Sequence, residues 1–190
     1  MKSLRLTLLA LPLALTGCST LSSVNWSAAN PWNWFGSSTE VTEQGVGALT
    51  AATPLEEPAI AEALDGDYRL RSGMKTDNGN VVRFFEAMKG DSVAMVINGE
   101  QGTVSRIDVL DSDIPTAGVK IGTPFSDLYS KAFGNCQKAD GDDNRAVECK
   151  AEGSQHISYQ FSGEWSGPEG LMPPDDVLKN WDVRKIIWRR

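Results

Sequence analysis

The sequence predicts an α+β fold built mainly from antiparallel sheet, with about eight strands, one clear helix at about residues 124–133 and short helical turns. Two observations carry this prediction. Short runs of alternating apolar and polar residues are separated by turn residues, and one stretch spaces its apolar residues as a helix does. The pattern continues from residue 60 to residue 190, so we expect a single domain there.

Four strand-like runs in the first half of this domain follow one another with turn residues between them. They cover residues 67–71, 81–88, 92–97 and 103–110. The turn signals include Asp77-Asn78-Gly79 and, as the strongest, Asn98-Gly99. Runs at this spacing predict an antiparallel meander.

The helix prediction rests on start and stop signals around one apolar face. Thr123 is placed as the N-cap with Pro124 at the first helical position, and Gly134 is placed as the stop. The apolar residues recur at i, i+3, i+4 and i+7, namely Phe125, Leu128, Tyr129 and Ala132. We expect a helix of about ten residues here.

The second half of the domain predicts four more strands around a polar loop at residues 140–144. These strands begin at Cys136 and cover residues 146–149, 155–161 and 183–188. Short helical turns are expected near residues 60–64 and 174–178.

The N-terminus reads as a bacterial lipoprotein signal. Lys2 and Arg5 precede a short apolar run, and Leu15-Thr16-Gly17-Cys18 matches a lipobox. The apolar run is too short to span a bilayer, which is typical of a cleaved signal. We therefore expect residues 1–17 to be removed and Cys18 to carry the lipid.

The predicted lipid explains how the mature chain stays at a membrane. Three acyl chains at ~0.8 kcal/mol per buried CH₂ would give effectively permanent attachment. Ser19 follows Cys18, where Asp would favour retention at the inner membrane. Ser19 therefore predicts sorting to the outer membrane, with the domain facing the periplasm.

Residues 18–59 are predicted to be the lipidated N-terminus and a flexible tether, because they are polar and lack a sustained period. The tether contains a tryptophan-rich segment at residues 24–35. Two interpretations stay open for it. Its rings either lie against the membrane or a partner, since Trp favours the bilayer interface, or fold back onto the domain's own core.

Charge excludes one class of partner. The chain has 18 basic and 25 acidic residues, and loss of the signal peptide removes two of the basic ones. Such an acidic chain has no basic footprint for nucleic acid, so we expect no nucleic-acid partner. It would also be repelled by anionic lipid, so the membrane is contacted through the acyl chains.

Cys136 and Cys149 are the cysteines that remain after lipidation of Cys18. An even pair in an oxidising compartment predicts a disulfide, worth roughly 3 kcal/mol for so short a loop. A free thiol pair is the alternative, although the spacing does not match a redox motif.

No catalytic, metal or cofactor motif follows from the remaining polar residues. His156 falls on the polar side of its strand and is interpreted as an exposed histidine. Residues 140–144 begin like a calcium loop, but Arg145 stands where glycine is needed. We therefore predict no cofactor, no metal site and no catalytic residues.

Several stretches resemble one known family over essentially the whole chain. They are the lipobox, the tryptophan-rich segment, residues 66–75, residues 118–136 and the closing Lys185-Ile-Ile-Trp-Arg-Arg190. Together they are similar to the RpoE-regulated lipoproteins of enteric bacteria. The resemblance implies an envelope lipoprotein whose expression responds to envelope stress, and it brings no catalytic residues.

These observations predict an outer-membrane lipoprotein that is a non-enzymatic binding or structural module, with an unknown envelope protein or glycan as its partner. The alternative is an envelope hydrolase that uses acidic residues. Asp108, Asp111, Asp113 and residues 140–143 are its candidates, because paired carboxylates can cleave glycosidic bonds.

Overall fold

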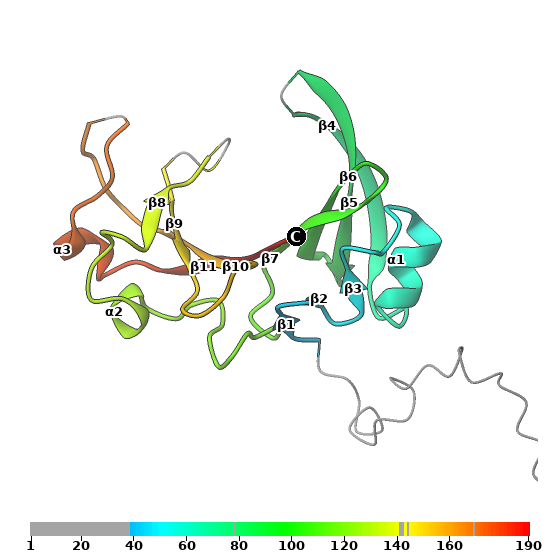
Figure 1. Ribbon diagram of the computed structural model, residues 1–190, viewed down its shortest axis with the longest axis horizontal. Coiled ribbons are helices and arrows are strands. Elements are labelled where there is room, and N and C mark those ends of the chain that lie inside the picture. The colour runs from blue at the N-terminus through cyan, green and yellow to red at the C-terminus, as the bar shows by residue number, and fades with distance from the viewer. Residues whose placement is uncertain (1–38, 78, 141–142, 144, 169) are drawn as a thin grey trace, which may run out of the picture. The chain divides into compact units, whose positions relative to one another are not determined.

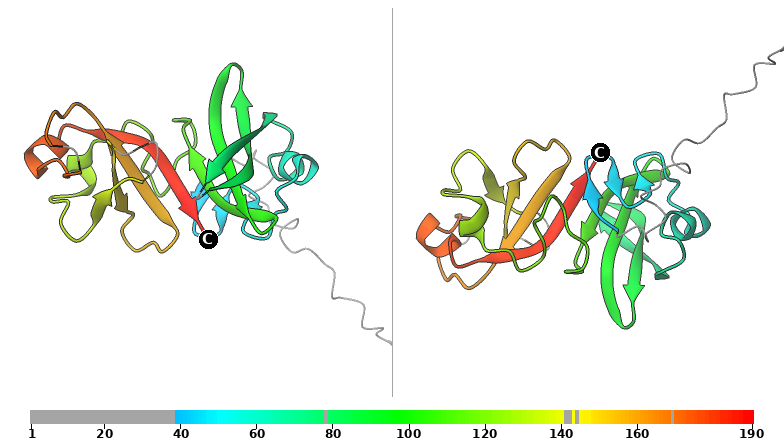
Figure 2. Two further views of the ribbon diagram at one scale, coloured as in Figure 1. Left: turned by 90° about the horizontal axis from the view of Figure 1, so that it is seen from above. Right: turned by 90° about the horizontal axis from the view of Figure 1, so that it is seen from below.

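The computed structural model describes residues 39–190, except residues 78, 141–142, 144 and 169. Within these residues the strands form a large eight-stranded sheet and a small three-stranded sheet, and every strand pair is antiparallel (Figures 1 and 2). The predicted α+β class is confirmed. Cys18, Ser19 and the tryptophan-rich segment lie outside the described residues.

The first half of the domain contains the small sheet, one helix and a four-stranded meander. Its elements are β1 (Val41–Thr42), β2 (Gly45–Val46), β3 (Leu49–Thr50), α1 (Glu57–Ala63), β4 (Arg69–Asp77), β5 (Asn80–Lys89), β6 (Ser92–Glu100) and β7 (Thr103–Val109). The meander has the order β4-β5-β6-β7, as predicted.

The second half adds the other strands of the large sheet and two short helices. Its elements are α2 (Phe125–Leu128), β8 (Cys136–Lys138), β9 (Val147–Lys150), β10 (Ile157–Ser162), α3 (Asp175–Leu178) and β11 (Asp182–Arg189). The last strand, β11, lies between β7 and β10 and so joins the two halves. Figure 1 shows α1 beside the β4–β6 half and α2 beside the β8–β10 half.

The core lies on one face of the large sheet. A row of directly paired residues crosses five neighbouring strands and is buried throughout. The row consists of Phe85, Ile97, Ile107, Trp188 and Ile157. Each such side chain contributes about 1.5–3 kcal/mol when buried, so this face drives folding.

An aromatic cluster extends the core over the second half. The ring centroids of Phe125 and Phe161 lie 5.1 Å apart, and those of Tyr129 and Phe161 lie 5.9 Å apart, both edge to face. Edge-to-face contact is favourable for aromatic pairs. Phe125 and Tyr129 were placed correctly on the buried side by their spacing.

The predicted helix at about residues 124–133 is wrong in length, because α2 ends at Leu128. Tyr129 has extended backbone angles (φ −136°, ψ 131°), and its hydroxyl donates to the carbonyl oxygen of Lys150 at 2.6 Å. The Ala132 amide donates to Asp175 at 2.8 Å instead of to a helical carbonyl. Tertiary partners thus replace the second helical turn.

The turn predicted at Asn98-Gly99 is also wrong. Both residues belong to β6, the register shifts between them, and the hairpin turns at Gln101-Gly102. Gln101 and Gly102 have φ of 54° and 84°, which suits a tight hairpin turn. This turn keeps Ile97 opposite Ile107 in the core.

The domain begins earlier than predicted, since residues 39–59 are part of it. Val41, Val46 and Leu49 of the small sheet are buried in the core. The Trp188 indole N–H donates to the Glu43 carbonyl oxygen at 3.1 Å, which ties the small sheet to β11. Strands of two residues are too short to show an alternating pattern, which is why the sequence predicts a tether here.

Cys136 and Cys149 lie directly opposite one another in the β8–β9 ladder. Their sulfur atoms are 2.09 Å apart, which is disulfide distance, and Cys149 is fully buried. The bond would fix the edge strand β8, which is only three residues long, to the rest of the sheet.

We predict that Cys136→Ala lowers the free energy of unfolding by about 2–4 kcal/mol, because the cross-link restrains the unfolded chain. Cys136 is the better residue to change, since Cys149 packs in the core. Urea denaturation measures the change, and reduction of the parent protein should reproduce it. Two alkylated thiols in unreduced protein from the periplasm would contradict the prediction.

Candidate functional site

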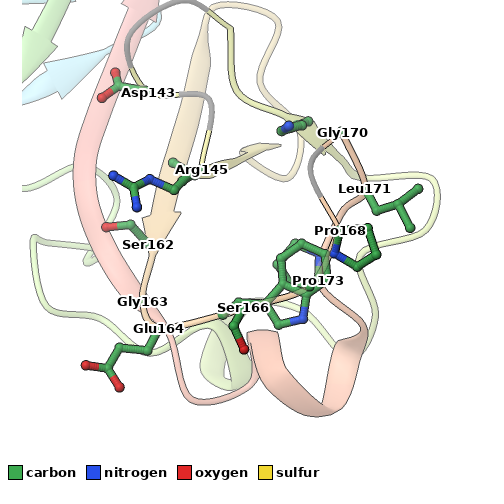
Figure 3. A pocket seen from close by; sticks show the side chains of 14 residues that line it. Asp143, Arg145, Ser162, Gly163, Glu164, Ser166, Pro168, Gly170, Leu171 and Pro173 are labelled. Atoms are coloured by element: carbon green, nitrogen blue, oxygen red, sulfur yellow. The ribbon is translucent and has the colours of Figure 1, made fainter.

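A pocket of about 1050 Å³ lies where β10 ends (Figure 3), and it is larger than a second hollow near the start of β10. Its lining comes from β8, the hairpin that joins β8 to β9, and the segment 162–173 that follows β10. In Figure 3, Asp143 and Arg145 lie at the hairpin side, while Leu171 and Pro168 lie at the opposite side. The pocket therefore has a charged side and an apolar side.

Two glycines let the segment 162–173 pass close to indole rings. A Cβ at Gly163 would lie 2.3 Å from Cδ1 of the buried Trp181. A Cβ at Gly167 would lie 1.9 Å from Cζ2 of Trp165, which lines the pocket. Any larger residue would push these rings away, so Gly167 shapes the apolar wall through Trp165, while Gly163 leaves room for Trp181 in the core.

Asp143 fixes the charged side of the pocket to the sheet. Its carboxylate accepts a hydrogen bond from Lys185 of β11 at 2.6 Å. Burial would raise the pKa of Asp143, but the hydrogen bonds from Lys185 and Gln160 outweigh it and lower the pKa below its usual value. Asp143 is therefore an anion at neutral pH.

Lys185 also connects this pocket to a charge pair in the middle of the sheet. Its Nζ lies 3.7 Å from the Asp108 carboxylate, which accepts from Arg106 Nε at 2.6 Å. Burial disfavours the charged form of Arg106, but the adjacent Asp108 more than offsets this and raises the pKa of Arg106. We call this side of the large sheet the charged face; it lies opposite the core.

A second network occupies the charged face nearer the other end of β10. Arg189 contacts the Glu148 carboxylate with both terminal nitrogens, one of them at 2.9 Å. Ser158 donates to the same carboxylate at 2.6 Å. Burial would raise the pKa of Glu148, but Arg189 and Ser158 outweigh burial and lower it. These residues line the smaller hollow, of about 530 Å³.

His156 lies beside this network and is partly buried rather than exposed as predicted. Its Nδ1 lies 2.7 Å from the carbonyl oxygen of Arg189, and its ring stacks on Trp188 at 6.3 Å between centroids. The strand pairing explains the burial, because β11 brings Trp188 alongside. In the described part of the chain, no group of three or more His, Cys, Asp or Glu side chains is placed to hold a metal ion.

Four of the acidic residues suggested for a hydrolase form two groups, each around a lysine, while residues 141–142 lie outside the described residues. Asp111 and Asp113 contact Lys89 at 3.0 and 2.7 Å, near the start of β6. Asp108 and Asp143 share Lys185. The structure therefore gives each of these four carboxylates a lysine partner.

Sequence reasoning missed the charged networks. The sequence predicts that the polar side of residues 155–161 is exposed, whereas Ser158 on that side is buried. In residues 183–190, charged pairs stand on either side of Ile186-Ile187-Trp188 and show no alternation. Such a pattern does not identify which residues of other strands lie opposite Lys185 and Arg189.

The comparisons with known proteins place the chain in a family. Residues 23–190 match the model of the family described as protein of unknown function, DUF1131, and the chain belongs to that family. It is 87% identical to the uncharacterized protein YfeY of Escherichia coli strain K12, over the full length of both. The resemblance drawn from the motifs is thereby confirmed.

A solved structure is also similar to the domain. The crystal structure of the uncharacterized protein yfeY from Escherichia coli has a TM-score of 0.75 and 83% sequence identity. The similarity covers 80% of this chain and all of that one. No helix among the residues described here is long and apolar enough to cross a membrane.

We predict that Glu148→Gln lowers the free energy of unfolding by about 1–3 kcal/mol at pH 7, because Arg189 loses its charged partner. Arg189 is 39% exposed, so the loss is smaller than for a fully buried pair. Urea denaturation measures it, and Glu152→Gln is a matched control because Glu152 is exposed.

The lowered pKa of Glu148 fixes the sign of the pH dependence. Its stabilising effect is present above the unfolded pKa of about 4.5 and is lost as the pH falls through the lower folded pKa. The parent should therefore lose more stability than Glu148→Gln between about pH 5 and pH 3. Parallel stability profiles for the two proteins would contradict this assignment.

Proposed function

We propose that this chain is an outer-membrane lipoprotein, anchored through Cys18, whose domain faces the periplasm and binds an envelope partner. The single observation that carries the anchor is the lipobox at residues 15–18 behind a basic start and an apolar run. The described domain begins at residue 39, so an uncharged stretch of sequence separates it from Cys18.

Two further features support the proposed location at the outer membrane. Ser19 after the lipidated residue favours release from the inner membrane. Cysteines at disulfide distance suit an oxidising compartment such as the periplasm. Expression under envelope stress is what the resemblance to RpoE-regulated lipoproteins implies, and we include it in the proposal.

The domain is proposed to bind rather than to catalyse. Hydrolysis by a carboxylate pair needs one group that is protonated at working pH, with a raised pKa. Lysine partners instead lower the pKa of Asp143 and of Asp113. The acidic residues therefore give little support to the alternative of an envelope hydrolase.

The pocket beside β10 is the proposed binding site. Trp165 and Leu171 offer apolar surface, while Asp143, Arg145 and Glu164 offer charges of both signs. Such a lining suits a ligand with apolar and polar parts, which fits an envelope glycan or a protein segment. No nucleic acid is proposed as a partner, because the chain is acidic.

We predict that Cys18→Ala blocks lipidation and leaves the precursor in, or loosely at, the inner membrane, because the acyl chains no longer hold it. Ser19→Asp should keep the lipid but retain the protein at the inner membrane. Membrane fractionation of both variants beside the parent measures this. An outer-membrane location for Cys18→Ala, or an inner-membrane location for the parent, would refute the anchor.

For the pocket, we predict that Leu171→Asp abolishes recovery of the envelope protein or glycan that copurifies with the lipidated parent. Leu171 is 57% exposed at the pocket wall, so the change puts a charge on the apolar side without opening the core. Phe133→Asp is the matched control, because Phe133 is 84% exposed and lies outside the pocket lining. Equal recovery with both variants, or a measured turnover of envelope material, would count against this binding site.

A further inference from the structure

The strand β4 is an edge strand of the large sheet, and the helix α1 contacts it. Among the described residues it pairs with β5 alone, and no strand covers its other side. Pairing of β5 with β6 begins only at Phe84. The far part of the β4–β5 hairpin therefore extends past the rest of the sheet, as Figure 1 shows.

The hairpin register shows which backbone groups face this open edge. Asp77 pairs with Asn80, so only two residues connect the strands and this pair exchanges backbone hydrogen bonds. In an antiparallel ladder, such pairs alternate with pairs whose N–H and C=O groups point outward. Outward groups therefore belong to Leu70, Ser72, Met74 and Thr76.

The side chains beside this edge differ between its two faces. Arg69, Arg71 and Lys75 share the charged face of the sheet, since alternate residues of a strand lie on one side, and Arg71 forms an ion pair there with Glu86 of β5. Leu70 and Met74 lie on the opposite face, where Met74 is 70% exposed and Leu70 is partly buried against the core.

In the middle of β4, an aromatic ring covers Gly73. A Cβ at Gly73 would be 2.4 Å from Cζ of Phe84, its cross-strand partner. The Lys75 ammonium lies 6.0 Å from the centroid of the same ring. The Phe84 ring therefore occupies the charged face of β4 between Arg71 and Lys75.

We propose that β4 binds an extended segment of a partner protein, which adds to the large sheet as a further strand. Backbone groups of Leu70, Ser72, Met74 and Thr76 would pair with the added strand. Its residues on the charged face would meet Arg69, Arg71 and Lys75, and those on the other face would meet Leu70 and Met74. The segment is therefore one in which acidic residues alternate with apolar ones.

Charge argues against two other occupants of this edge. In a two-fold pairing of two copies centred on Gly73, Arg71 of one copy would face Lys75 of the other, and like charges opposite one another are destabilising. The chain's own residues 18–38 contain no Asp or Glu and so lack the acidic residues that the edge selects. These two arguments leave an acidic segment of a partner protein as the occupant of the β4 edge.

The test uses the mature full-length chain in detergent and a fluorescent peptide of alternating Glu and Val with the nine-residue length of β4. The peptide should bind, and a peptide with Lys in place of Glu should not. Lys75→Glu should weaken binding about tenfold, because attraction becomes repulsion. Lys131→Glu is the matched control, since Lys131 is exposed beyond α2 and makes the same charge change.

A second variant tests the backbone pairing itself. Met74→Pro removes one outward N–H while leaving the β4–β5 ladder intact, and it should also weaken peptide binding about tenfold. Circular dichroism checks that Met74→Pro is folded. If it is unfolded, Lys75→Glu still tests the proposal, because that substitution changes no backbone group. Fluorescence anisotropy measures binding for each protein.

Several outcomes would overturn this inference. They are no binding of the acidic peptide at millimolar concentration, equal binding of the lysine peptide, or no loss with folded Met74→Pro. A parent dimer that Met74→Pro dissociates would identify a second copy as the occupant. Binding at β4 would extend the proposed binding role, but it needs no lipid anchor. Membrane fractionation therefore tests the anchor, and peptide binding tests the β4 edge independently of it.

Discussion

The pairing of β11 with both β7 and β10 is the interaction on which the rest of the structure depends. Ile187 lies opposite Asp108 of β7 and Ser158 of β10, so the last strand joins the β4–β7 strands to the β8–β10 strands in one sheet. The same strand brings Lys185 to Asp143 and Arg189 to Glu148. The complete sheet and the charged networks therefore depend on the same strand. Both require the pairing of β11 with β7, and contacts between residues so far apart in the sequence are slow to form.

The two faces of the large sheet contribute differently to the fold. The apolar face supplies the free energy of folding, because its cross-strand rows are fully buried. The charged face supplies little net stability, since desolvation offsets the attraction within pairs such as Arg106–Asp108. It does specify register, because a slip of one residue in β11 would move Lys185 and Arg189 into the core.

Local periodicity predicted most of this architecture, and the misses share one cause. The alternating runs, the meander and the opposed cysteines follow from patterns confined to one strand or hairpin. The length of α2, the hairpin beyond β6 and the start of the domain were decided by distant partners, such as Asp175 for Ala132 and Trp188 for Glu43. The charged networks were missed for the same reason, since Arg189 and Glu148 are joined only by the folded sheet.

The two edges of the large sheet solve the problem of unwanted strand pairing in different ways. The edge strand β8 has only three residues, so it offers little backbone for pairing with another chain. Its Cys136 also lies at disulfide distance from Cys149 of β9. The β4 edge is long and open, and its protection is the row of Arg69, Arg71 and Lys75. For a protein concentrated on a membrane surface, as proposed here, repulsion between such rows opposes self-association. The charges that keep copies apart would thus also select an acidic partner.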